Sequence, residues 1–206
     1  MSVSLYLGAP RCGKSTLLRA HIYRSRIPVR AFLLMDRDSR GTWDGPTFRS
    51  VAELRARPDL PRFCIFQGPT GAEVAALAIE LGDAVFVDEE AHRTFAEGYG
   101  PARPDRPAHP LYRIAHEGAH LRNGRGEACQ VAALLATHRP ANLPADLVAC
   151  AERVYLGRTV LWRDVERCYR EGWVQPPSGE APRTPREAQR ILGSLAPGEF
   201  LTYSLR

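Results

Sequence analysis

The feature that most constrains this chain is a glycine-bounded loop near its start. Residues 8–15 read Gly-Ala-Pro-Arg-Cys-Gly-Lys-Ser, the pattern G-x-x-x-x-G-K-S, between an apolar run at residues 3–7 and a helical pattern from Thr16 onward. A strand, such a loop and a helix start direct backbone N–H groups and the positive end of the helix dipole into one concavity. That concavity suits a di- or triphosphate, with Lys14 reaching the terminal phosphates and Ser15 as a ligand of Mg²⁺.

The use of lysine in the chain supports this interpretation. Lys14 is the only lysine among 28 basic residues. An ammonium is a compact point charge that fits among phosphate oxygens, whereas the guanidinium of arginine is a planar fork. The alternative is a chance match in a tight turn. We predict a nucleotide site made by Gly8, Ala9, Pro10, Arg11, Cys12, Gly13, Lys14, Ser15 and Thr16.

Length and composition fit one globular domain. A chain of 206 residues can bury a proper core, so we expect a single domain over residues 1–206, with residues 175–206 as a linker, helix and possible edge strand. The net charge of +5 is compatible with nucleic acid as a partner. Five scattered cysteines without a C-x-x-C pair suggest buried thiols in a reducing compartment. The early first strand leaves no room for a signal peptide, so we expect a cytoplasmic protein.

Strand and helix patterns alternate along the chain. The sequence predicts strands at residues 3–7, 29–35, 62–66, 84–87, 131–136 and 153–156, and helices at residues 51–55, 72–81, 111–121, 164–171 and 185–195. The strands are apolar on both faces, which is typical of a parallel sheet covered on both sides. We therefore predict an α/β fold with a mostly parallel central sheet and helices on both faces.

An acidic pair ends one of the apolar strands. Asp88 and Glu89 follow the run at residues 84–87, at the carboxyl edge where open α/β sheets present their ligands. Asp88 would hold Mg²⁺ through its water shell, and Glu89 would orient and polarise the attacking water. A carboxylate for this second role favours hydrolysis over transfer to a substrate hydroxyl. The alternative is a solvated acidic helix start, since carboxylates favour helix N-termini.

A family resemblance appears in the second half of the chain. Residues 131–140 read Val-Ala-Ala-Leu-Leu-Ala-Thr-His-Arg-Pro and are followed by Asn-Leu-Pro at 142–144. This resembles the sensor strand of the FtsK–HerA superfamily, and residues 152–158 with Arg163 and Asp164 are similar to its closing strand and next helix. The small size is most similar to the genome-packaging ATPases of tailless viruses with an internal membrane.

The resemblance implies a RecA-like P-loop NTPase of the additional-strand type, with the Thr137 strand between the P-loop strand and the Asp88 strand. It further implies an ATP- and Mg²⁺-dependent, ring-forming homo-oligomer that pumps double-stranded DNA, with a capsid or membrane vertex as a further partner. Thr137 would sense the γ-phosphate. His138 stands where the family commonly has glutamine, and its imidazole could still donate a hydrogen bond.

Rings of this kind are completed by an arginine from the neighbouring subunit. The resemblance points to Arg122 and Arg125, before the sensor strand, with Arg139 as third choice. The proline-rich segment at residues 98–110, with Tyr99, Arg103 and Arg106, could be a pore-facing loop or an idle insertion.

The sequence leaves two alternative functions open. One is a nucleotide or small-molecule kinase, and the other is a P-loop assembly, extrusion or DNA-partition protein that uses nucleotide as a switch.

A second motif lies at residues 116–120. They read His-Glu-Gly-Ala-His, the H-E-x-x-H pattern whose histidines would share one helical face. Gly118 weakens such a helix and no convincing third ligand follows, so we predict no zinc site.

Overall fold

The computed structural model describes residues 3–25, 28–38, 43–96, 108–118, 120–177 and 179–204. Its contacts divide the chain into two compact units. The first unit comprises residues 1–3 and 26–135, and the second comprises residues 4–25 and 136–206. Most of the predicted 98–110 loop, including Tyr99, Arg103 and Arg106, lies outside the described residues.

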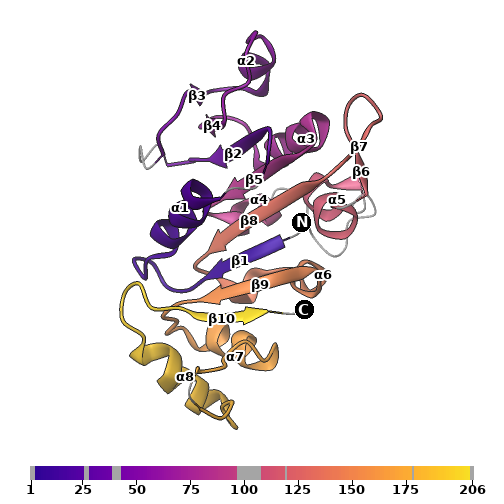
Figure 1. Cartoon of the computed structure of the whole chain (residues 1–206). Helices are drawn as coiled ribbons and strands as arrows, with labels where there is room; N and C mark the ends of the chain where they lie inside the picture. Colours follow the sequence, from indigo (N-terminus) through magenta and orange to yellow (C-terminus); the bar gives the residue numbers. More distant parts are fainter. Residues whose placement is uncertain are drawn as a thin grey trace. The chain divides into compact units, whose positions relative to one another are not determined.

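The first unit is built on a parallel sheet (Figure 1). Its strands lie in the order β3 (Thr47–Phe48), β4 (Phe63–Phe66), β2 (Ala31–Met35), β5 (Ala84–Asp88) and β8 (Val131–Thr137, whose last two residues belong to the second unit), and each neighbouring pair is parallel. Every residue of β2 and β5 is buried, so both faces of these strands are covered. β8 pairs with β5 in register, Val131 opposite Ala84.

Helices complete the first unit: α2 (Val51–Arg55), α3 (Gly71–Leu81), α4 (Ala91–Ala96) and α5 (Pro110–Glu117). Thr70 caps α3 as predicted, because its hydroxyl accepts from the Glu73 N–H while the Glu73 carboxylate accepts from the Thr70 N–H. The apolar side of α3 contacts β2, β5 and α5.

The second unit holds β1 (Val3–Leu7, apart from Val3), α1 (Lys14–Arg24), the short 3₁₀ helix η2 (Pro140–Asn142), α6 (Ala145–Ala149), β9 (Ala151–Leu156), α7 (Trp162–Arg170), α8 (Pro185–Ser194) and β10 (Leu201–Ser204). β9 lies between β1 and β10, and β10 pairs with it antiparallel as the edge strand that the sequence predicts. Among the described helices, none has the length and apolar character needed to cross a bilayer.

The predicted α/β class with a mostly parallel sheet is confirmed, and so are most element positions. The predicted helix at 111–121 is wrong at its end, since α5 stops at Glu117 and residues 121–122 form β6 (Leu121–Arg122), paired antiparallel with β7 (Ala128–Cys129). The chain leaves the helix because the Gly118 carbonyl accepts from the N–H of Val131, which joins it to the start of β8. His116 and His120 therefore do not share a helical face.

The cysteines are free thiols, as their spacing predicts. Cys12, Cys64, Cys129 and Cys168 are buried, and Cys150 is half-buried. Burial raises the pKa of the Cys64 thiol to about 11, so this side chain stays protonated at neutral pH. Such thiols behave as small apolar side chains.

Candidate active site

The glycine-bounded loop joins β1 to α1 in the second unit, in the predicted order of strand, loop and helix. Gly8 has a φ of +143°, and a Cβ there would lie 2.8 Å from Cys12 Sγ and 3.1 Å from the Arg158 carbonyl oxygen. Gly13 has a φ of +99° and directly precedes the helix. Both positions therefore require glycine, since an L side chain would be strained at either φ and would collide at the first.

The start of α1 is suited to an anion. Gly13 offers no side chain to cap the helix, and the first turn contains no acidic residue. The N–H groups of a first helical turn have no partners within the helix, and the helix dipole adds partial positive charge. Lys14 Nζ donates to the carbonyl oxygens of Gly8 and Ala9, both at 2.8 Å, which holds the ammonium against the loop.

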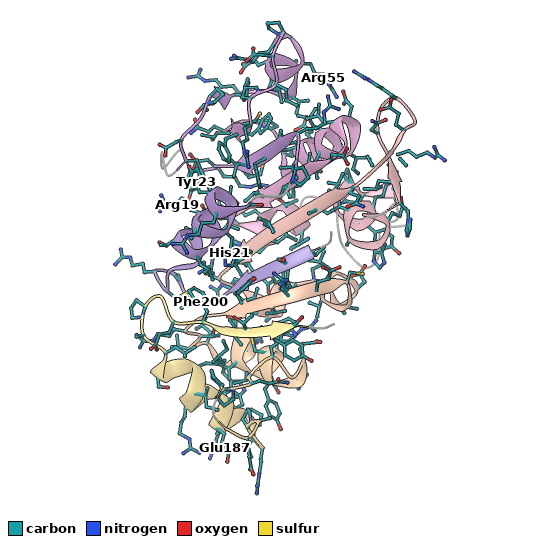
Figure 2. All side chains as sticks on the ribbon, in the orientation of Figure 1. Arg19, His21, Tyr23, Arg55, Glu187 and Phe200 are labelled. Atoms are coloured by element: carbon teal, nitrogen blue, oxygen red, sulfur yellow. The ribbon has the colours of Figure 1, made fainter. Side chains whose placement is uncertain are left out.

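Two distant segments of the second unit support the loop. The Ala9 N–H donates to the Arg158 carbonyl at 2.6 Å, and the Gly198 N–H donates to the Cys12 carbonyl at 3.0 Å. Phe200, labelled in Figure 2 just before β10, packs its ring against Gly157. The sequence analysis missed this support, because no local pattern links residues near 157 and 200 to residue 12.

The end of β8 is held in a defined turn, also in the second unit. Thr137 is buried, and its hydroxyl accepts from the Arg139 N–H at 3.0 Å. Asp164, buried in the first turn of α7, accepts from the Ala141 N–H at 2.9 Å through Oδ1. These bonds fix the segment that carries His138, which is half-buried.

The predicted acidic pair lies in the first unit. Asp88 is the last residue of β5 and is fully buried, whereas α4 begins only at Ala91. This placement argues against a solvated acidic helix start. Its Oδ1 accepts from the Glu90 N–H at 2.8 Å, and its Oδ2 accepts from the Thr94 hydroxyl. Glu89 follows at the strand end and is half-buried.

Oxygen donors of the kind that Mg²⁺ prefers are present in both units. Mg²⁺ is usually held by one or two carboxylates together with substrate phosphates and waters. Asp88 supplies one buried carboxylate at a strand end, and Ser15 supplies a hydroxyl in the first turn of α1. Each of these donors is a hard oxygen, which suits Mg²⁺ rather than a soft metal.

Three arginines are predicted to act in the nucleotide site of a neighbouring subunit, and their surroundings differ. Arg122 is exposed in β6, and its guanidinium donates to the Gly126 carbonyl at 2.7 Å within the same hairpin. Arg125 is exposed in the turn of that hairpin, where the Asn123 side chain accepts from its N–H. Arg139 is exposed at the start of η2.

No family model matches the sequence, and no curated protein matches it either. Solved structures with a similar fold include the genome packaging NTPase B204 from Sulfolobus turreted icosahedral virus 2 in complex with ATP-gammaS (TM-score 0.68) and with AMPPCP (TM-score 0.69). They also include B204, the DNA-packaging ATPase from Sulfolobus turreted icosahedral virus (TM-score 0.65).

Each of these structures is 15% identical to this chain, covers 99–100% of it and is itself covered over 92% of its length. The likeness extends over nearly the whole of both chains, so it concerns the architecture rather than one motif. The chain therefore has the fold of these genome-packaging NTPases, as the resemblance in its sequence implies.

Proposed function

We propose that this chain is an ATP hydrolase that translocates double-stranded DNA, acting in the packaging of a viral genome. The observation that carries the proposal is the loop at residues 8–15, where the only lysine of the chain lies against the loop carbonyls beside an uncapped helix start. The fold shared with packaging NTPases whose structures were solved in complex with ATP-gammaS and AMPPCP supports it.

The chain's own residues have distinct roles in this proposal. Lys14 exchanges the carbonyls of Gly8 and Ala9 for phosphate oxygens, while loop N–H groups bind the same phosphates. Ser15, directly, and Asp88, through the metal's water shell, would hold Mg²⁺, which when bound would neutralise charge on the β- and γ-phosphates. Glu89 orients the attacking water and accepts its proton.

The end of β8 supplies the residues that respond to the nucleotide. Thr137 and His138 sense the γ-phosphate, in a turn that Asp164 stabilises. Developing charge on the γ-phosphate is neutralised by an arginine from a neighbouring copy in a homo-oligomeric ring, with Arg125 the first choice because Arg122 already bonds within its hairpin.

DNA is the proposed macromolecular partner. Arginines lining a ring bind phosphates without regard to sequence, so the affinity falls as salt rises. We further propose that the protein acts in the host cytoplasm and docks on a capsid or membrane vertex, and that residues 1–206 form one domain.

Nucleotide binding tests the observation that carries the proposal. Lys14→Ala removes the charge-assisted bonds to phosphate, so we expect its affinity for a fluorescent ATP analogue, measured by anisotropy with Mg²⁺, to fall about a hundredfold. Arg19→Ala, which removes a basic residue further along α1 (Figure 2), is the matched control and should bind within about twofold of the unmodified chain. Equal binding by Lys14→Ala would contradict the proposed phosphate site.

A further inference from the structure

Two side chains that the sequence analysis did not single out lie beside the Asp88 carboxylate. Arg37 donates from Nη2 to Thr94 Oγ1 at 2.6 Å, and the Thr94 hydroxyl donates to Asp88 Oδ2. The same Nη2 lies 3.8 Å from Asp88 Oδ2. Asp88 and Thr94 are fully buried, and the Arg37 side chain is 15% exposed. We call this chain of three residues the Asp88 relay.

The hydrogen bonds of the Asp88 relay can run in only one direction, from Arg37 through Thr94 to Asp88. A guanidinium donates hydrogen bonds and cannot accept them, so Thr94 Oγ1 must be the acceptor from Arg37. A hydroxyl carries one proton, and the bond to Asp88 Oδ2 uses it. Thr94 therefore stands between the positive charge and the carboxylate. A direct fork-like ion pair between Arg37 and Asp88 is replaced by a 3.8 Å approach.

The first turn of α3 leaves room for the relay. A Cβ on Gly71 would lie 2.0 Å from Thr94 Oγ1 and 2.8 Å from Arg37 Nη2. Any side chain there would push these two groups apart. The relay thus depends on β5, α4, the end of β2 and the start of α3 together, which is the mark of a built arrangement rather than a chance contact.

We propose that the Asp88 relay sets the divalent-cation affinity of the site: Thr94 keeps Asp88 available to the metal, and the charge of Arg37 limits how tightly the metal binds. Arg37 and Thr94 are positioning residues, and the proposal rests on the proposed role of Asp88 in holding Mg²⁺ through its water shell. A unit positive charge a few ångströms from the carboxylate repels a divalent cation in a site where solvent screens it poorly.

The two halves of the relay predict changes of opposite sign. Arg37→Gln keeps an N–H donor for Thr94 but removes the charge, so the affinity for Mn²⁺ should rise about tenfold. Thr94→Val removes the hydroxyl and lets Arg37 pair directly with Asp88, so the affinity for Mn²⁺ should fall about tenfold. The conservative variants Arg37→Lys and Thr94→Ser should stay within about threefold of the unmodified chain.

The measurement is a titration of Mn²⁺ into the full chain, held in excess over AMPPNP, with free Mn²⁺ followed by electron paramagnetic resonance. Thermal unfolding of each variant reports the structural cost separately. Arg93→Ala is the matched control. Arg93 lies on α4, shortly after Asp88 in the chain, but its side chain is 48% exposed and paired with Glu90 and Asp38. It should leave the Mn²⁺ affinity unchanged.

The outcomes separate the relay from the proposed function. Opposite shifts for Arg37→Gln and Thr94→Val support the relay. Equal affinities, or shifts in the same direction that follow the loss of thermal stability, overturn it while leaving the nucleotide site in place. Failure of the unmodified chain to bind Mn²⁺ with AMPPNP overturns both the relay and the role of Asp88.

Discussion

The fold disfavours the protonated, positively charged form of His21. It lies on α1 (Figure 2), where Nδ1 is 2.8 Å from the Tyr6 hydroxyl and the ring lies 4.8 Å from that of Tyr155. Desolvation lowers the pKa of His21, and the positive charges of Arg153 and Arg24 lower it further. Burial raises the pKa of the Tyr6 hydroxyl, so this group stays protonated at neutral pH.

This pKa gives the second unit a stability that depends on pH. The folded pKa of His21 lies below its unfolded value, so the unfolded chain binds more protons in mild acid. The contribution of His21 to stability is present above about pH 6.5 and is lost as pH falls through the folded pKa. We predict that urea midpoints drop between about pH 7 and pH 5, and that His21→Gln reduces this drop.

The control for this prediction is His116→Gln, which removes an exposed histidine on α5 in the other unit. It should leave the dependence of the urea midpoint on pH as it is in the unmodified chain. An identical acid-induced drop in His21→Gln would show that other groups cause it.

Among the elements, the β6–β7 hairpin allows two neighbouring arginines to be separated by experiment. Arg122 is bonded within the hairpin, while Arg125 lies in its exposed turn. If Arg125 acts on the neighbouring subunit, Arg125→Ala and Glu89→Gln should each be inactive alone, yet an equal mixture should recover about a quarter of the turnover. That fraction follows because a quarter of the interfaces pair an intact site with an intact arginine.

The control mixture contains Arg122→Ala and Glu89→Gln. Arg122 bonds only the Gly126 carbonyl in its own hairpin among the contacts described, so Arg122→Ala should keep most of its activity without a partner. Full activity of Arg125→Ala alone would exclude it as the arginine that acts across subunits.

Local signals explain which elements the sequence predicts well. The loop at 8–15, the capped helix after Thr70 and the apolar strand before Asp88 are each specified by adjacent residues, and their bounds agree closely with the structure. The residues that support these sites from elsewhere in the chain have no such local signal. Arg37 meets Thr94 across 57 positions, and the segment near Phe200 reaches the loop only through the tertiary fold. No periodicity or cap reveals such contacts, so Arg37, Thr94 and Phe200 could not be found from the sequence alone.

The wrongly predicted helix end and the short elements that were not predicted also have physical causes. The pattern at 111–121 keeps helical spacing beyond Glu117, but the bond from Val131 to Gly118 and the pairing of β6 with β7 outweigh that local preference. Short elements such as β3 and α6 are stabilised by their neighbours and carry little signal of their own.

For the molecule as a whole, the shared fold does not by itself establish the function. This chain is 15% identical to the packaging NTPases, so its partner must be identified by measuring its activity. A net charge of +5 with an arginine-rich composition is compatible with a polyanionic partner. We therefore propose that ATP hydrolysis by this chain is coupled to double-stranded DNA.

The most direct measurement is the rate of ADP formation by the full chain with Mg²⁺, with and without linear double-stranded DNA, over a range of salt concentrations. We predict a several-fold stimulation by DNA at low salt that weakens as salt rises, and almost no turnover by Glu89→Gln in either condition. ATP turnover that is indifferent to DNA at low salt would contradict coupling to DNA, and ADP formed only when a nucleoside monophosphate is added would indicate a kinase instead.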